Sequence, residues 1–99
     1  MAHYSRGASA ERELFQLLWS SGFAVVRAAG SGKMPLPSPD LVALGKNRKI
    51  AFECKYYRSN YLHIKKEQFE DLIKWGELAD SEVVVAWKIP NKGLSLIHI

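Results

Sequence analysis

Residues Asp40–Tyr57 (DLVALGKNRKIAFECKYY) carry the clearest structural pattern in this chain. Two segments, Asp40–Leu44 and Ile50–Tyr57, are rich in the β-branched and aromatic residues that are typical of strands. The basic segment Gly45–Lys49 between them has the composition of a hairpin turn. We therefore expect two adjacent antiparallel strands here, and the rest of the chain can be placed around them.

Charged side chains fall at defined positions on this hairpin. Because successive side chains of a strand point to opposite faces, Glu53 and Lys55 share one face and Cys54 points to the other. Asp40 opens the first strand, so the hairpin places it on the strand next to Glu53. An isolated Glu-x-Lys pair is more often a cross-strand ion pair on an exposed sheet face. The addition of Asp40 favours a functional interpretation.

Two neighbouring carboxylates repel each other unless a cation lies between them. Hard divalent ions such as Mg²⁺ take carboxylate oxygens as ligands and keep several waters. A metal held by Asp40 and Glu53 would activate a bound water and stabilise the charge on a phosphate under attack. Lys55 would orient the attacking water or hold the phosphate. The pattern therefore indicates metal-dependent hydrolysis of a phosphodiester.

A helix and a strand precede the hairpin. Apolar residues recur with a helical period over about Gly7–Ser21, and Gly22 ends the helix. The short β-branched segment Phe23–Arg27 follows as a strand. Ala28–Pro39, with two glycines and three prolines, is a loop.

Glu11 has an informative position in this first helix. On a helical wheel it falls between Leu14 on one side and Phe15 on the other, so it points toward the core. The helix dipole favours an acid in the first turn, but it does not explain an acid on the apolar face. We therefore expect Glu11 to reach toward Asp40 and Glu53 and to complete a metal's ligand set.

A helix and two strands follow the hairpin. The helix is expected over about Lys65–Ala79, and one of its faces carries Phe69, Leu72, Ile73, Gly76 and Ala79. Val83–Ile89 is nearly all apolar, which predicts a strand buried on both faces. Leu94–Ile99 alternates like a final strand. The order is αβββαβ(β), an α/β (α+β) fold with a mixed central sheet flanked by helices, in a single domain over residues 1–99.

The charge and the cysteine content of the chain favour some classes of function and exclude others. The 99 residues carry a net charge of +4, and residues 1–66 alone have eleven basic and four acidic side chains. A basic half favours a polyanionic partner, most often nucleic acid. A single cysteine excludes a disulfide framework within the chain and a four-cysteine metal site, and it is typical of the reducing cytoplasm. No apolar run is long enough to span a membrane, and no signal peptide is visible.

The chain carries an acid on the first helix, followed by an Asp and a Glu-x-Lys on paired strands. In this order of residues it resembles the restriction-endonuclease-like nuclease superfamily. More specifically, the chain resembles the archaeal Holliday-junction resolvases over about residues 4–90. The matching segments are Arg6–Ala8, Ala10–Leu14, Gly22–Ser31, Asp40–Ala43 and Phe52–Lys55.

This resemblance implies a homodimer with two Mg²⁺-dependent sites, in which Mn²⁺ can substitute. Each site would nick one of two opposed strands of a four-way DNA junction and leave a 5′-phosphate. Glu11, Asp40 and Glu53 would bind the metal directly or through water, and Lys55 would position the attacking water. Ser31 would act near the scissile phosphate. The residues expected on the DNA surface are Arg6, Arg12, Arg27, Lys33 and Lys88.

Two departures from the resolvases stand out. The loop Met34–Pro39 is longer and richer in proline than in some relatives, and relatives continue beyond the position of Ile99. We expect the native C-terminal segment to be missing. Two other functions stay open on the residues alone. One is another nuclease of the same fold that acts on duplexes, flaps or specific sites, and the other is a DNA-binding module without catalysis.

Overall fold

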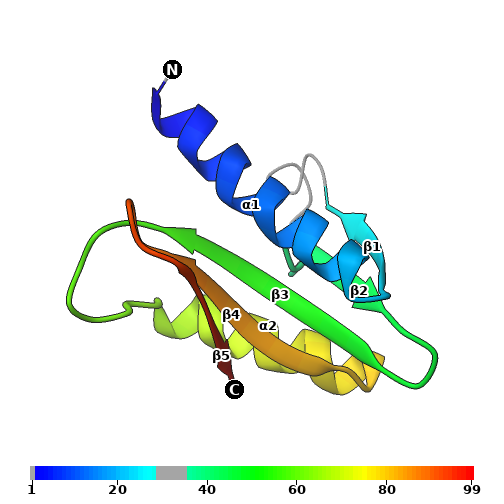
Figure 1. Ribbon diagram of the computed structural model, residues 1–99. Helices are drawn as coiled ribbons and strands as arrows, with labels where there is room; N and C mark the ends of the chain where they lie inside the picture. The colour runs from blue at the N-terminus through cyan, green and yellow to red at the C-terminus, as the bar shows by residue number, and fades with distance from the viewer. Residues whose placement is uncertain (1, 29–35) are drawn as a thin grey trace.

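The structure is a computed structural model that describes residues 2–28 and 36–99. Ser31 and Lys33, which were expected at the DNA, lie outside the described residues. The elements run in the order α1 (Ala2–Ser20), β1 (Ala24–Arg27), β2 (Leu41–Leu44), β3 (Lys49–Tyr56), α2 (Lys66–Ala79), β4 (Glu82–Lys88) and β5 (Leu94–His98). Figure 1 shows this path along the chain.

The strands form one mixed five-stranded sheet in the order β1-β2-β3-β4-β5. The pairs β1–β2, β2–β3 and β4–β5 are antiparallel, whereas β3 and β4 are parallel and are joined through α2. A parallel neighbour requires such a crossover, because a tight turn cannot return the chain to the same end of the sheet. The predicted mixed sheet is therefore confirmed, and β5 is its fifth strand.

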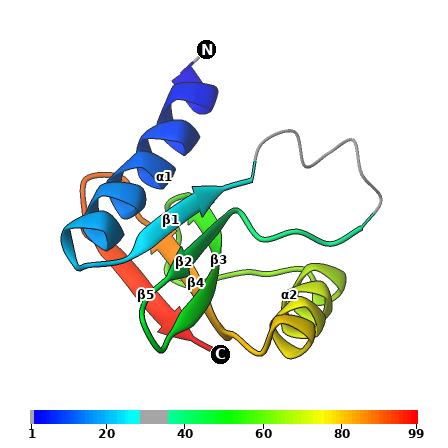
Figure 2. The same cartoon turned by 90° about the vertical axis from the view of Figure 1, so that its right-hand side faces the viewer.

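The two helices cover opposite faces of the sheet (Figure 2). Alternation along β4 shows why both faces are apolar. Val84 and Ala86 pack with Leu14 and Leu18 of α1, whereas Val83 and Val85 pack with Leu72 of α2. All of β4 from Val83 to Trp87 is buried. The prediction that this strand is buried on both faces is thus confirmed.

Helix α2 lies close to the sheet because of Gly76. A Cβ at this position would overlap the Cγ2 atom of Val83 in β4. The helix ends at Asp80, which adopts a left-handed conformation with φ 54°. The N–H of Ser81 then donates to the Gly76 carbonyl at 2.9 Å. Close packing and a defined end together hold α2 against the parallel β3–β4 pair.

Several predicted details were wrong. Helix α1 begins at Ala2 instead of Gly7, because one glycine is tolerated inside a helix at a cost of about 1 kcal/mol. Strand β2 begins at Leu41, so Asp40 precedes it. Phe69 was expected on the packed face of α2, but it is 37% exposed. Only a narrow stripe of α2 that includes Leu72 and Gly76 is fully buried. Neither α1 nor α2, as the structure describes them, combines the length and the apolar composition that a membrane-spanning helix requires.

Candidate active site

Asp40 lies where strands β1, β2 and β3 come together. Its backbone N–H donates to the Phe52 carbonyl at 2.9 Å, and its own carbonyl accepts from Ala28 at 2.9 Å. The Oδ2 atom of its side chain accepts the backbone N–H of Cys54 at 2.8 Å. The carboxylate thus accepts a hydrogen bond from a backbone N–H of β3, just beyond the end of the β2–β3 ladder. Both its backbone and its side chain are fixed by these bonds.

The carboxyl groups of Asp40 and Glu53 are neighbours across β2 and β3. Leu41 of β2 pairs with Phe52 of β3 in an antiparallel register. Asp40, just before β2, therefore lies beside Glu53 of β3. Burial raises the pKa of both groups. For Glu53, burial and then the adjacent Asp40 carboxylate raise the pKa to about 7. The predicted proximity of these two acids is therefore found in the structure.

Lys55 lies on the same face of β3 as Glu53. Its Nζ atom is 3.7 Å from Oε2 of Glu53 and donates to Oε1 of Gln68 at 2.7 Å. The Nε2 atom of Gln68 in turn donates to Oε2 of Glu53 at 3.2 Å. The side chains of Lys55 and Glu53 are only 19% and 13% exposed. An ammonium and a carboxyl group are thus held together in a partly dehydrated position.

Gln68 is a member of the site that the sequence pattern did not predict. The signal was nevertheless present, because Gln68 and Leu72 are four residues apart and therefore lie on the same face of α2. A polar residue directly before the buried stripe of a helix faces the sheet that the stripe covers. Periodicity identifies the apolar residues of α2, and Gln68 is the polar member of the same stripe.

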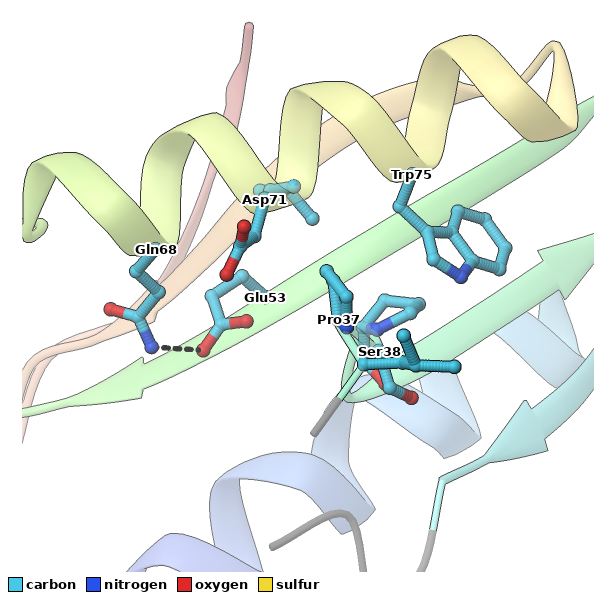
Figure 3. A pocket seen from close by; sticks show the side chains of 9 residues that line it. Pro37, Ser38, Glu53, Gln68, Asp71 and Trp75 are labelled. Carbon is cyan, nitrogen blue, oxygen red and sulfur yellow. Dashed lines mark hydrogen bonds between the residues drawn. The ribbon is translucent and has the colours of Figure 1, made fainter. Parts of the chain in front are cut away.

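Glu53 and Gln68 also line a cleft of about 210 Å³ between α2, β3 and the segment before Asp40. Figure 3 shows the Gln68 and Asp71 side chains directed from α2 toward Glu53, with the Trp75 ring further along the same helix. The lining residues are Leu36, Pro37, Ser38, Pro39, Glu53, Gln68, Asp71, Leu72 and Trp75. The cleft therefore has polar groups at Glu53 and apolar walls on either side of them.

Glu11 is paired with an arginine of β1 and is also close to Asp40. Its side chain is 24% exposed, in agreement with its predicted orientation toward the core. However, its Oε1 atom accepts from Nε of Arg27 at 2.8 Å. Glu11 is still close enough to raise the pKa of Asp40. Within residues 2–28 and 36–99, no group of three or more acidic, His or Cys side chains is arranged to hold a metal ion.

The expected DNA-contacting residues for which the structure describes side chains lie on or beside α1. Arg12 is exposed on α1, and it lines a shallow pocket with Glu11, Phe15 and Arg27. Lys88 lies at the end of β4, and its Nζ atom is 3.0 Å from Oε2 of Glu13 in α1. The backbone of Arg6 lies within α1, but its side chain is outside the part that the structure describes.

Cys54 does not have the properties of a nucleophile. It packs against the core beneath α1, on the opposite face of β3 from Glu53. Burial and the nearby carboxylates raise the pKa of its thiol. A thiol in such surroundings stays protonated at neutral pH, which makes it a packing residue.

The donor set at Asp40 and Glu53 fits a hard divalent cation. Both carboxyl groups are partly dehydrated and repel each other when both are charged, and a cation between them would relieve that repulsion. The bonds from Cys54 and Gln68 occupy one oxygen of each group, Oδ2 and Oε2. Oδ1 of Asp40 and Oε1 of Glu53 lie outside these bonds. Two carboxylates and a lysine are the side chains that metal-assisted attack of water on a phosphate requires.

Known proteins have sequences similar to that of this chain. The chain is 38% identical over 88 residues to crossover junction endodeoxyribonuclease Hjc of Archaeoglobus fulgidus, which is 89% of this chain and 65% of that protein. It is 40% identical over 91 residues to the protein of the same name from Methanocaldococcus jannaschii, which is 92% of this chain and 65% of that protein. The chain thus spans about two thirds of the length of these relatives.

A solved structure gives the same result. The structure of A. fulgidus Hjc, described as a Holliday junction resolvase from an archaeal hyperthermophile, matches with a TM-score of 0.82 and 35% identity. The match covers 89% of this chain and 72% of the solved one. The family model for archaeal Holliday junction resolvase (hjc) matches residues 2–99. The resemblance seen in the sequence is confirmed, and the chain belongs to the archaeal Holliday junction resolvase (hjc) family.

Proposed function

We propose that this protein is a metal-dependent endonuclease that nicks opposed strands of four-way DNA junctions. The observation that carries the proposal is the arrangement of Asp40, Glu53 and Lys55 at the end of the β2–β3 ladder. Family membership supports the substrate, because the relatives are named crossover junction endodeoxyribonucleases. The proposal includes a cytoplasmic location, because the proposed substrate is DNA.

The metal in this proposal is Mg²⁺, with Mn²⁺ as a substitute. Asp40 and Glu53 would hold it through the carboxylate oxygens that lie outside the bonds to Cys54 and Gln68. Glu11 would contribute through a water, since its carboxylate is paired with Arg27. When bound, the cation supplies Lewis-acid stabilisation of the negative charge that develops on the phosphate.

The side chains of the site have separate tasks. Asp40 is fixed by three hydrogen bonds, so its carboxylate needs little rearrangement before it binds a cation. Lys55 presents an ammonium next to the carboxylates and orients the attacking water toward the phosphorus. Attack on the phosphorus with departure of the 3′-oxygen leaves a 5′-phosphate on the product. Ser31 is assigned to the surroundings of the scissile phosphate.

The DNA surface in this proposal is formed by Arg6, Arg12, Arg27, Lys33 and Lys88. Of these, the described side chains lie on the α1 side of the sheet, close to Glu11 and Glu13. Phosphate contacts from such residues give affinity without reading the base sequence. This property suits an enzyme that recognises the shape of a branch.

The cleavage of two opposed strands requires two sites. We propose that a homodimer supplies them, with one site in each subunit. A single subunit contains one Asp40–Glu53–Lys55 arrangement, which is enough for one nick. A second copy related by a two-fold axis would match the two-fold symmetry of a four-way junction.

A cleavage assay tests the function. A labelled four-way junction and a linear duplex of the same sequence are incubated with the protein in Mg²⁺ or in EDTA. Paired nicks in the junction alone, lost in EDTA, support the proposal. Cleavage of both DNAs contradicts the junction selectivity and favours another nuclease of the same fold. Tight binding without cleavage in Mg²⁺, by a sample that sediments as a dimer, favours a binding module and contradicts the proposed reaction.

A further inference from the structure

We propose that Gln68 is a positioning residue for the reaction, because its amide fixes the Lys55 ammonium relative to the Glu53 carboxylate. The inference rests on the proposed function, since it assigns a role within the same site. Gln68 lies near the start of α2, whereas Lys55 and Glu53 lie on β3. The link therefore connects a helix to the strand that carries the reacting groups.

The hydrogen bonds give the amide one orientation. An ammonium group only donates, so the group that faces Lys55 must be the oxygen of the amide, Oε1. The NH₂ group then faces Glu53, where it donates to Oε2. The two bonds are 2.7 and 3.2 Å long, whereas the direct distance from Lys55 to Glu53 is 3.7 Å. Gln68 thus lies between the two charged groups and contacts both.

The partial burial of Gln68, Lys55 and Glu53 strengthens the two hydrogen bonds of the Gln68 amide. The three side chains are partly buried, and hydrogen bonds in a site of low polarity are stronger than in water. Without the amide, Lys55 has a long flexible chain with several rotamers. Its ammonium would either move closer to the Glu53 carboxylate or turn toward solvent. Either change would move it away from the attacking water.

The helix that carries Gln68 is itself firmly placed. Leu72, one turn further along the same face, is 5% exposed and packs on Val83 and Val85. Two turns further, Gly76 allows close contact with Val83. The amide is therefore supported by packing, in the way that precise sites require.

The test uses Gln68→Met, which keeps the volume and the helix propensity of the side chain but removes both hydrogen bonds. The matched control is Glu70→Gln, an exposed position on the same helix. Positioning predicts a kcat for junction cleavage about 10 to 100 times lower, with the Kd for junction DNA and the Tm unchanged. A merely structural role predicts no loss of kcat, because methionine fills the same space. A kcat within twofold of the wild type would overturn the proposal.

A second measurement separates this inference from the proposed function. The chain has two glutamines, Gln16 and Gln68, so their side-chain amide NMR signals are readily assigned. In metal-free protein, Lys55→Met is expected to shift the Gln68 signal and to leave that of exposed Gln16 in place. An unchanged Gln68 signal overturns the contact whether or not the protein cleaves DNA. A shifted signal in a protein without nuclease activity supports the contact and contradicts the function.

Discussion

Asp40 and Glu53 meet one residue beyond the Leu41–Phe52 pair, where the β2–β3 ladder ends and β3 continues alone beside β4. Their carboxyl groups are close enough to share a hydrogen bond, and the pKa of each is raised. In the metal-free protein this contact is unfavourable once both groups are charged. In the proposed function, the same contact would favour the binding of a divalent cation.

The pH dependence of stability follows from the Glu53 pKa. Below its ordinary pKa of 4.5, Glu53 is protonated in the folded and the unfolded chain. Between 4.5 and about 7 only the folded protein keeps the proton, so the free energy of unfolding falls as pH rises. The loss amounts to at most about 3 kcal/mol.

Glu53→Gln removes this titration. Urea unfolding at pH 4, 6 and 8 is expected to show the variant gaining stability relative to the wild type as pH rises. Glu70→Gln, an exposed change on α2, is the control and should show no such trend. A stability difference between Glu53→Gln and the wild type that is the same at all three pH values would disagree with the raised pKa.

Divalent cations should stabilise the folded protein more at high pH than at low pH. The carboxylates must lose their shared proton before they bind a cation, so binding competes with protonation. Mg²⁺ or Mn²⁺ in large excess over its Kd, about 100-fold, should add about 2.7 kcal/mol to the free energy of unfolding. Thermal unfolding at pH 5.5 and pH 8 measures the effect. Asp40→Asn should abolish it, and retention of the full shift in that variant would exclude Asp40 as a ligand.

Gly76→Ala should destabilise the protein. The added Cβ would overlap Val83 and push α2 away from β4. Overpacking of this kind costs about 1–3 kcal/mol, more than the roughly 1 kcal/mol that alanine gains over glycine as a helix former. Gly93→Ala is the matched control, because a Cβ there meets nothing within 4 Å. Urea unfolding that ranks the two variants in the opposite order would contradict the close packing of α2.

Arg12→Ala should weaken junction binding through the loss of one phosphate contact. The side chain is exposed on α1 beside Glu11 and Arg27. A lost contact is expected to reduce the slope of log K against log salt by about 1. Lys46→Ala is the control, because Lys46 is exposed in the β2–β3 turn, at the other end of the hairpin from Asp40. Equal slopes for Arg12→Ala and the wild type would place the DNA elsewhere.

The pairing of Asp40 with Glu53 could be predicted because a hairpin has little freedom. The alternation of apolar side chains sets the strand register, because Leu41 and Ala43 must face the same side as Ile50 and Phe52. In that register Leu44 pairs with Lys49, so the turn is one residue shorter than the predicted Gly45–Lys49. The burial of β4 could be predicted for a similar reason, since an uninterrupted apolar strand must be covered on both faces. The family resemblance depended on the same local motifs, and it was confirmed.

Contacts between distant elements could not be predicted in the same way. A helical wheel gives the direction of Glu11, but it does not identify Arg27 as its partner. Gln68 was missed because its partners, Lys55 and Glu53, lie on another element, and their distances depend on how closely Gly76 lets α2 approach the sheet. Periodicity indicates which side of a helix faces the core. The partners of a polar side chain are set by tertiary packing.

If Asp40, Glu53 and Lys55 form a catalytic site, the rate of cleavage should depend on the Lys55 ammonium group, which Lys55→Met removes. The measurement is the single-turnover rate of junction cleavage in Mg²⁺ with enzyme in excess, with Lys46→Ala as the control. We expect a rate at least about 100 times below the wild type for Lys55→Met, with unchanged Tm and junction affinity, and a normal rate for the control. A Lys55→Met protein that cleaves as fast as the wild type would contradict the assignment of this site.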